Sequence, residues 1–435
     1  MFTHFFNRHN FQLCISKYPL LLVCSFIYFS ACHEIVCGND ILTPGKAISL
    51  KEAIDIALER NPQLQSMNDQ VAAELGSLNQ SKLYPNPVIE LLAEEMPTDE
   101  IGLNESQNRV SITQPIITGG KRGLGIKVSK KAKEKNEFER DAFLIGIIAD
   151  TKKAFYKVLA DQESCSVAKE MEKVAKDIYE SEKIRFDVGE VALTNVLRSE
   201  VELSKARNLV FHAEGELQNS FRELQTIMGT PEVTDFTITG KLITAPTALS
   251  LHELEQHMKN NHPIFKASEK KREMADAQLL LEQRQVIPDI AVSAGYKRLS
   301  QEDADTFEFG LEIPVPFFNR NQGNIQKSKA LSNKAKNEGI SLDNHMLFEL
   351  KRNFNLYNVE RKRLLEFNDV ILPRADEALS LITKGYKEGE FGYIDLLDTQ
   401  RIWADTRISY NESIKRLNTI LADIERLAVM KIREQ

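Results

Sequence analysis

Two aspartates near the start of a long helical pattern, Asp395 and Asp398, are the residues best placed to do chemistry. Their spacing of three residues puts both carboxylates on one face of a helix. No histidine, serine or further acid stands at a spacing that completes a catalytic group, so electrostatic attraction of cations is the chemistry they offer. The alternative is a solvated helix face whose acids favour the first turns of the helix.

Three other groups of residues resemble known sites but lack an essential member. The glycines of 119–123 lie between a predicted strand and a predicted helix, as in a phosphate loop, but Pro115 stands where that loop needs glycine. The eight histidines show no metal-ligand spacing, and His252 and His257 are five apart. Cys165 is alone outside the first 37 residues and is predicted to pack in a core. The sequence therefore predicts no metal, nucleotide or cofactor site.

The two aspartates follow a glycine turn that occurs twice in the chain. Residues 186–200 and 386–400 lie 200 positions apart, and each begins with an aromatic residue that precedes Gly-Glu by three positions. Glycine commonly ends a helix because it enters the left-handed region at little steric cost. Gly189 and Gly389 are therefore predicted to mark the tips of two helical hairpins.

The duplication extends over most of the chain. Landmarks in the first half recur 199 to 201 positions later. The matched landmarks are 49–64 with 250–265, Pro62 with Pro263, Pro115 with Pro314, Gly189 with Gly389, and Leu197 with Leu397. A constant offset across separate landmarks indicates two copies of one unit. We predict repeats at 48–228 and 249–431, joined by a linker at 229–248 that is rich in Thr, Pro and Gly.

Each half is predicted to contain two strands. Residues 290–296 and 307–315 alternate between apolar and polar side chains, the period-2 pattern of a sheet with one apolar face. The first-half counterparts, around 87–95 and 107–117, alternate less regularly. Four strands cannot close a sheet within one chain, so several chains would have to share it.

The helices are predicted to be unusually long. Residues 121–185 contain no proline and would span roughly 100 Å at about 1.5 Å per residue. Pro373 predicts a kink or break in the matching stretch 317–384. In the first half, the helices expected at 63–83 and 191–228 together match the long helix in length. We therefore predict one continuous helix beside two shorter helices stacked end to end, with coiled-coil-like packing.

The first residues read as an export signal. Residues 1–31 contain two basic side chains and no acid, and the apolar run 20–31 is too short to span a bilayer. The residues around Cys32 resemble a lipidation signal, which would make Cys32 the lipidated first residue; cleavage after Gly38 is the alternative. The whole chain has 56 basic and 63 acidic side chains, a net charge of −7 that does not favour a nucleic-acid surface. No other stretch is apolar over the length of a spanning helix, so any crossing must use strands.

Duplicated halves, each with two strands, a long helix and a glycine tip, resemble the TolC family of outer-membrane efflux channels. Residues 49–64, 83–91 and 110–126 resemble its heavy-metal-efflux, CzcC-like branch. The resemblance covers nearly all of 48–431. It implies a mainly α fold with a small β part. Duplicated long-helix hairpins would form the periplasmic α-helical tube of a homotrimer, and four strands per protomer would join a twelve-stranded β-barrel in the outer membrane.

The resemblance also implies a function and partners. The leading function is passive, non-enzymatic export of divalent heavy-metal cations from the periplasm or cytoplasm. The implied partners are a periplasmic adaptor (membrane fusion protein), an inner-membrane RND transporter and outer-membrane lipid, with no nucleic acid. Alternatives are a TolC-like channel for drugs or organic compounds, or for type I secretion. A periplasmic coiled-coil adaptor fits less well because the sequence shows no lipoyl-like β domain between its helices. A coiled-coil scaffold or an enzyme domain would not need amphipathic strands at matching places.

In TolC-like channels, acidic residues on the second hairpin ring the periplasmic mouth, and the matching positions are Asp395 and Asp398. Three copies would place their carboxylates around one constriction, as acidic rings do in cation pores. Tyr386 matches the tyrosine of the family's closing network. Phe391 stands where the family has that tyrosine's basic partner, which leaves Tyr386 without it.

The hairpin tips are the expected docking surface for the adaptor. The residues concerned are Gly189, Glu190, Val191, Gly389, Glu390 and Phe391. Exposed Val191 and Phe391 would favour contact with another protein. The alternative is that both tips are simple helix turns.

Overall fold

The computed structural model describes residues 46–95, 106–231, 236–299 and 302–431. All of them belong to the unit Leu42–Gln435, which is distinct from Met1–Ile41. The predicted signal peptide, both cleavage positions and Cys32 lie outside the described residues. No helix within the described ranges is both long enough and apolar enough to cross a bilayer.

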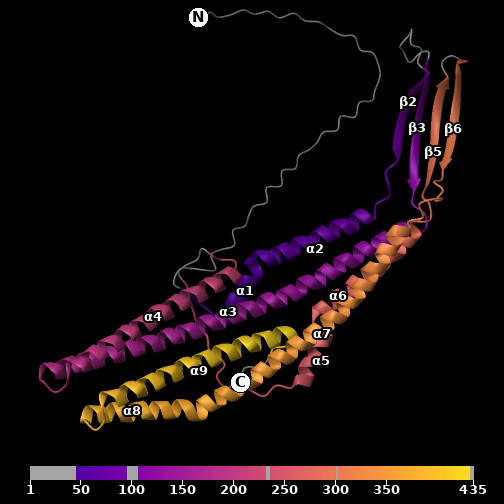
Figure 1. The fold of residues 1–435 in the computed structure, drawn as a ribbon. Coiled ribbons are helices and arrows are strands. Elements are labelled where there is room, and N and C mark those ends of the chain that lie inside the picture. The colour runs from indigo at the N-terminus through magenta and orange to yellow at the C-terminus, as the bar shows by residue number, and fades with distance from the viewer. Residues whose placement is uncertain (1–45, 96–105, 232–235, 300–301, 432–435) are drawn as a thin grey trace, which may run out of the picture. The chain divides into compact units, whose positions relative to one another are not determined.

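Both halves fold into the same series of elements (Figure 1). The first half consists of α1 (Leu50–Arg60), α2 (Pro62–Ser81), β2 (Val88–Glu94), β3 (Gln107–Ile116), α3 (Lys121–Asp187) and α4 (Leu193–Ile227). The second half consists of α5 (Leu251–Asn261), α6 (Pro263–Arg284), β5 (Ile290–Leu299), β6 (Ala304–Glu312), α7 (Gln322–Glu366), α8 (Leu372–Glu388) and α9 (Tyr393–Ala428). Short strands β1 (Lys46–Ile48) and β4 (Phe236–Ile238) pair in parallel. The predicted mainly helical architecture with a small β part is confirmed.

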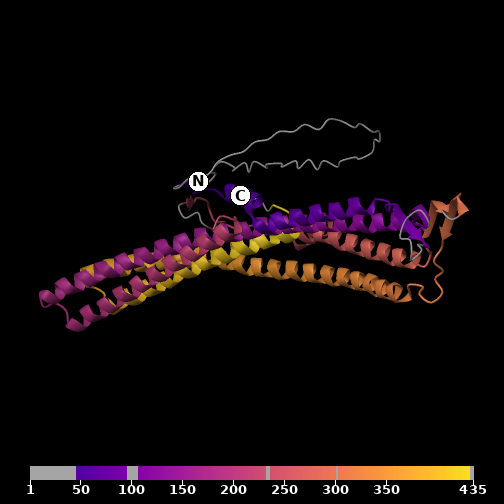
Figure 2. The same cartoon turned by 90° about the horizontal axis from the view of Figure 1, so that it is seen from above.

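Helices and strands follow one common order across the molecule. The strands are hydrogen-bonded in the order β2-β3-β5-β6, and each neighbouring pair is antiparallel. Below them, α3 packs against α2 and α4 and also against α6 and α9, while α7 packs against α6 and α9. Figures 1 and 2 show the strands at one end of these helices and both helix turns at the other. The predicted arrangement of a long helix beside two stacked shorter helices is thus confirmed.

A single asparagine makes the stacking joint of the first half. Asn61 ends α1 and caps α2, because its side-chain oxygen accepts hydrogen bonds from the backbone N–H of Gln63 and Leu64. Its amide group also donates to the carbonyl of Ile227 at the end of α4, at 2.8 Å. An asparagine at a cap satisfies helix N–H groups that otherwise lack partners. Here the same side chain also joins two helices end to end.

The glycine segment after β3 forms a joint between sheet and helix. Gly120 has a φ of 70°, a left-handed conformation that other residues rarely adopt, and it directly precedes α3. The ammonium of Lys121 is buried there, where it donates to the carbonyl of Ile287 at 2.8 Å and pairs with Asp289 at 2.7 Å. These contacts tie the start of α3 to the segment that leads into β5.

Prolines explain where the second half departs from the predicted boundaries. β6 ends at Glu312 rather than at 315, because Pro314 and Pro316 have no N–H to continue a strand ladder. The following helix starts at Gln322 rather than at 317. The predicted kink is confirmed: a π-helical turn, Phe367–Ile371, separates α7 from α8 just before Pro373.

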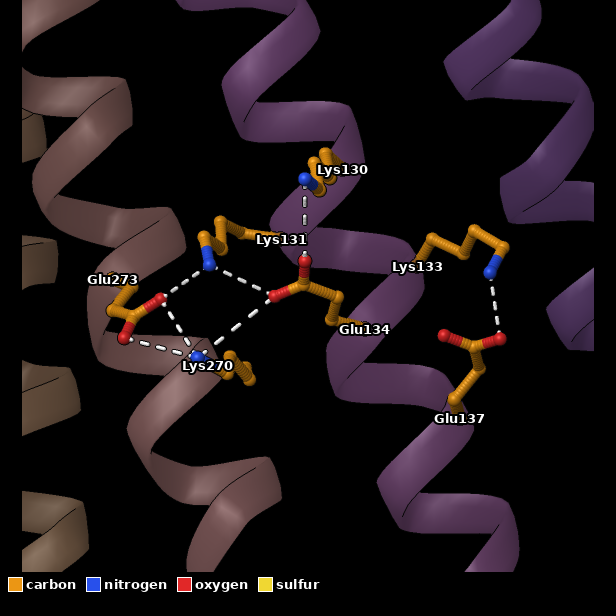
Figure 3. Close-up of polar contacts among 7 residues, drawn as sticks. All are labelled: Lys130, Lys131, Lys133, Glu134, Glu137, Lys270 and Glu273. Carbon is orange, nitrogen blue, oxygen red and sulfur yellow. Dashed lines mark hydrogen bonds and ion pairs between the residues drawn. The ribbon is translucent and has the colours of Figure 1, made fainter.

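An ion-pair network joins α3 to α6 and so links the two halves (Figure 3). The Lys131 ammonium lies 2.8 Å from Glu134 on its own helix and 2.7 Å from Glu273 on α6. Lys270 of α6 pairs with Glu273 at 3.1 Å and with Glu134 at 3.8 Å. Hydrogen bonds to both glutamates raise the pKa of Lys131, and the same contact with Lys131 lowers the pKa of Glu273. Charges of opposite sign therefore face each other across the contact between α3 and α6.

Candidate functional site

The two hairpin tips have the same backbone geometry. Gly189 and Gly389 have φ values of 83° and 81°, both in the left-handed region. In each tip the N–H of the following glutamate donates to the carbonyl five residues earlier, at 2.9 Å in the first tip and 2.7 Å in the second. This is the hydrogen-bond pattern of a glycine-terminated helix. The duplication predicted from sequence therefore holds at the level of single hydrogen bonds.

The side chains of the two tips differ more than their backbones. Phe391 is 42% exposed, and its ring packs on Gly385, where an added Cβ would lie 2.3 Å from a ring carbon. Val191 is half-buried, contrary to the expectation that it is exposed. Apolar surface at the first tip comes instead from Ile184 and Val188, which are 65% and 67% exposed.

Tyr386 of α8 joins the two hairpins near their tips. Its hydroxyl donates a hydrogen bond to the carboxylate of Glu182 on α3 and accepts one from the guanidinium of Arg185 at 2.9 Å. The Glu182 side chain is fully buried, and it also pairs with Arg185 at 3.5 Å. A buried carboxylate needs such partners to offset its lost hydration. We call Tyr386, Glu182 and Arg185 the hairpin latch.

Sequence reasoning missed both partners of this tyrosine. It found Phe391 where a basic residue was expected, whereas the basic partner is Arg185, about 200 residues earlier on the other hairpin. A signal was available, because Arg185 directly precedes Phe186, the counterpart of Tyr386 in the duplicated register. Burial and the hydrogen bond to Glu182 raise the pKa of Tyr386 to about 12. The hydroxyl therefore keeps its proton at neutral pH and donates a hydrogen bond to Glu182.

The two predicted gate aspartates lie in the first turns of α9 but have different surroundings. The Asp395 carboxylate accepts a hydrogen bond from the backbone N–H of Gly392 at 3.0 Å, so it caps the start of α9. The Asp398 side chain is 63% exposed and lies 3.9 Å from Arg401. Arg401 also pairs with Glu202 on α4. Both aspartates are exposed, but Asp395 contacts the backbone of its own helix start whereas Asp398 contacts a neighbouring arginine.

A groove runs between α4 and α9 beside Asp398. It has a volume of about 470 Å³, and its walls combine apolar side chains with charged ones. Tyr393 lies in its wall; its hydroxyl is buried and has no hydrogen-bond partner among the residues that the structure describes. Burial, and then the negative charges of Glu202 and Glu182, raise the pKa of Tyr393 to about 12. No pattern in the sequence distinguishes this tyrosine from the other aromatic residues.

The four-stranded sheet has one exposed apolar face. The strand register aligns apolar side chains in rows that cross all four strands. One row is Leu91, Val110, Tyr296 and Phe307, and the next is Ile89, Ile112, Ala294 and Phe309. Phe307 and Phe309 are 78% and 86% exposed in the single chain. A continuous apolar surface of this kind requires an apolar partner or a lipid environment.

The histidines within the described residues lie apart from these features. Among the described residues, no three His, Cys, Asp or Glu side chains gather in a group that could hold a metal ion. His252 contacts Gln256, and His262 caps α6 by accepting from the N–H of Ile264 at 3.2 Å. Burial, and then the charge of Arg426, lower the pKa of His262 to about 4. His262 is therefore neutral at neutral pH and occupies the position that Asn61 has in the first half.

Comparison with known proteins identifies relatives along nearly the whole chain. A family model described as "Outer membrane efflux protein" matches residues 53–230 and again 254–428. The cobalt-zinc-cadmium resistance protein CzcC of Cupriavidus metallidurans is 26% identical over 370 residues, covering 83% of this chain and 85% of that protein. The nickel-cobalt-cadmium resistance protein NccC of Alcaligenes xylosoxydans xylosoxydans is 24% identical over 291 residues, covering 65% of this chain and 63% of that protein.

The fold is also similar to that of a solved outer membrane channel. The Campylobacter jejuni CmeC outer membrane channel superposes with a TM-score of 0.72 and is 17% identical in sequence. The match covers 87% of this chain and 85% of that one. At this identity the likeness is one of fold, namely long helical hairpins joined to a small sheet.

Proposed function

This chain belongs to the outer membrane efflux protein family, and we propose that it is the outer-membrane channel of a tripartite system that exports divalent heavy-metal cations. Its similarity to a cobalt-zinc-cadmium resistance protein supports this cargo. Drugs or other organic compounds are the rival cargo. In this role the channel conducts passively and catalyses no reaction, and an inner-membrane transporter supplies the free energy for export.

The observation that carries the channel proposal is the sheet. Within the described residues, the outer edges of β2 and β6 have no strand partner, although one face of the sheet is apolar and exposed. Unpaired edges and exposed apolar rows are both costly in a single chain. β6 runs antiparallel to β2, because three antiparallel pairings separate them. Copies can therefore join β6 to β2 and keep every neighbour antiparallel.

Three copies joined in this way would enclose a pore. Their apolar rows would face lipid, and the opposite, polar face would line the interior, as in spanning sheets generally. The helices below would continue the wall as a tube in the periplasm. On this proposal the repeats 48–228 and 249–431 each contribute half of one subunit's wall, and 229–248 links them. Residues 1–31 would be removed on export, with lipidation at Cys32 as one outcome and cleavage after Gly38 as the other.

The hairpin ends would form the periplasmic entrance. The hairpin latch holds α8 against α3, so releasing Tyr386 would let the second hairpin move away from the first. Asp395 and Asp398 from three copies would place six carboxylates around the entrance and attract cations. Glu190, Glu390 and their neighbours at the tips would receive the periplasmic adaptor. Exposed Ile184, Val188 and Phe391 supply apolar contact area there.

A deletion strain tests this function most simply. Cells that lack this chain should become sensitive to divalent metals such as cobalt, zinc or cadmium, and the plasmid-borne gene should restore resistance. A panel of drugs and detergents serves as the comparison. Unchanged metal tolerance together with new drug sensitivity would show that the cargo is organic compounds rather than metal cations. A plasmid-borne gene that carries Asp395→Asn and Asp398→Asn should restore less metal resistance than the unaltered gene, because the entrance then attracts cations more weakly.

A further inference from the structure

The polar face of the sheet carries an arginine held between two glutamates. Arg109 on β3 lies 3.5 Å from Glu90 on β2 and 3.7 Å from Glu308 on β6. The three residues therefore span all four strands. The Arg109 side chain is 29% exposed, and its Nε atom is buried without a hydrogen-bond partner among the described residues. We call these three residues the cross-sheet triad.

A glycine makes this long contact possible. Glu308 pairs in register with Gly295 on β5, and Gly295 pairs with Ser111 on β3. Because Gly295 has no side chain, the β5 position directly opposite Glu308 leaves room for the Arg109 guanidinium. A Cβ at residue 295 would lie 3.1 Å from the Ser111 side chain. The glycine at position 295 thus leaves space above β5 for the Arg109 side chain.

The polar face as a whole is negative. By the strand register, the carboxylates on this face are Glu90, Glu94, Glu308 and Glu312, and the cations are Arg109 and Lys297. Four carboxylates against two cations leave two negative charges per chain. Lys297 lies 4.0 Å from Glu94, so each cation on this face stands beside a carboxylate. The face attracts cations, but its carboxylates at the centre are already engaged.

We propose that the cross-sheet triad is a second cation-selective element of the channel, in which Arg109 keeps Glu90 and Glu308 from binding the metal ions that pass. This inference rests on the proposed function, because it needs three copies that line a pore with their polar faces. Divalent metals bind tightly where several free carboxylates converge. A conducting pore needs attraction strong enough for entry and weak enough for release. An arginine fixed between two carboxylates meets both needs, because it leaves net negative charge and occupies the carboxylate oxygens.

Block of current by a divalent metal tests this directly. Purified protein in planar bilayers would carry potassium current while cadmium chloride is added to one side. The Arg109→Gln variant should be blocked at a cadmium concentration about tenfold lower than the unaltered chain, because freed carboxylates gain affinity for the metal. Arg298→Gln is the matched control. Arg298 also pairs with two carboxylates, Asp303 and Asp305, but the strand alternation puts it on the opposite face.

Further variants separate the outcomes. Adding Glu90→Gln and Glu308→Gln to Arg109→Gln should return cadmium block to the unaltered level. Equal block of the unaltered chain and the Arg109→Gln variant would overturn the inference. Absence of any current from the unaltered chain would instead overturn the proposed function. Should Arg109→Gln fail to assemble, the pair Glu90→Gln and Glu308→Gln keeps the arginine and should shift the reversal potential toward anion preference; an unchanged potential would also overturn the inference.

Discussion

At the scale of single residues, the chemistry of this chain depends on how buried charges are paired. Glu182 has no exposed surface, and the Tyr386 hydroxyl and Arg185 are its partners. Leaving a buried charged group without a hydrogen bond costs about 1–3 kcal/mol or more. The hairpin latch is therefore stable only while all three side chains are present. A small change at one of them should alter how often the proposed entrance is open.

Removing one hydroxyl tests the latch. Tyr386→Phe leaves Glu182 buried with Arg185 alone, so the closed arrangement should lose about 1–3 kcal/mol and the ratio of open to closed channels should rise about fivefold to a hundredfold. Single-channel recording in planar bilayers measures this ratio. Tyr410→Phe is the control, since Tyr410 is a half-buried tyrosine of α9 whose ring packs edge-on against Phe367. Equal open fractions in both variants would show that the latch does not hold the entrance shut.

The pKa of Tyr386 predicts how the latch responds to pH. A tyrosine ordinarily titrates near about 10, and here burial and Glu182 raise the pKa to about 12. Because the neutral hydroxyl is the favoured form in the fold, its contribution is complete below the ordinary pKa and is lost as pH rises through 12. The open fraction of the unaltered channel should therefore not rise when the pH is raised from about 6 to about 9. An opening in that range that Tyr386→Phe abolishes would contradict this assignment.

At the scale of elements, the sequence predicted much of the fold because its signals are local. The glycine tips and the break at Pro373 follow from backbone preferences of single residues. The two strand pairs follow from the alternation of apolar and polar side chains. Helix lengths alone indicated which helices stack end to end. The strand β6 was predicted too long because its apolar alternation continues past Pro314, whose missing N–H has more influence than the pattern.

The parts of the site that the sequence did not predict depend on contacts between distant segments. Arg185 and Tyr386 meet because two hairpins pack side by side, and periodicity does not describe that packing. Val191 and Phe391 occupy equivalent positions, yet one is half-buried and the other is 42% exposed. Phe391 packs on a glycine, Gly385, in its own hairpin, whereas the matching position in the first hairpin is Arg185. Side-chain surroundings of this kind require the assembled structure.

Two glycines with similar backbone angles provide a test of element packing. Gly189 and Gly229 have φ values of 83° and 70°, so an alanine is strained at either position. A Cβ at residue 189 meets nothing within 4 Å, whereas at residue 229 it would lie 2.3 Å from the carbonyl oxygen of Arg60.

Gly189→Ala should therefore cost about 1 kcal/mol of unfolding free energy, and Gly229→Ala should cost several times more. Urea unfolding of the detergent-solubilised protein, followed by tryptophan fluorescence, compares them. Similar midpoints for the two variants would mean that the junction of α1 with the end of α4 can accommodate an added methyl group, which would contradict the close contact at Gly229.

At the scale of the whole molecule, one chain is an incomplete structure. Among the described residues, the four-stranded sheet has two edges without a strand partner and an exposed apolar face. The helices α2, α3, α6 and α7 are neighbours in the same order as the strands β2, β3, β5 and β6. A closed assembly of copies would cover the edges, and lipid would cover the apolar rows. The duplication within the chain fits such an assembly, since each half supplies one strand pair and one helical hairpin to the wall of the channel.

Electron microscopy of the complex extracted from membranes with detergent tests that claim most directly. We expect three chains around one axis, with β6 of each chain hydrogen-bonded to β2 of the next and a continuous opening inside. Particles in which these two strands stay unpaired, or in which no opening runs along the axis, would contradict it.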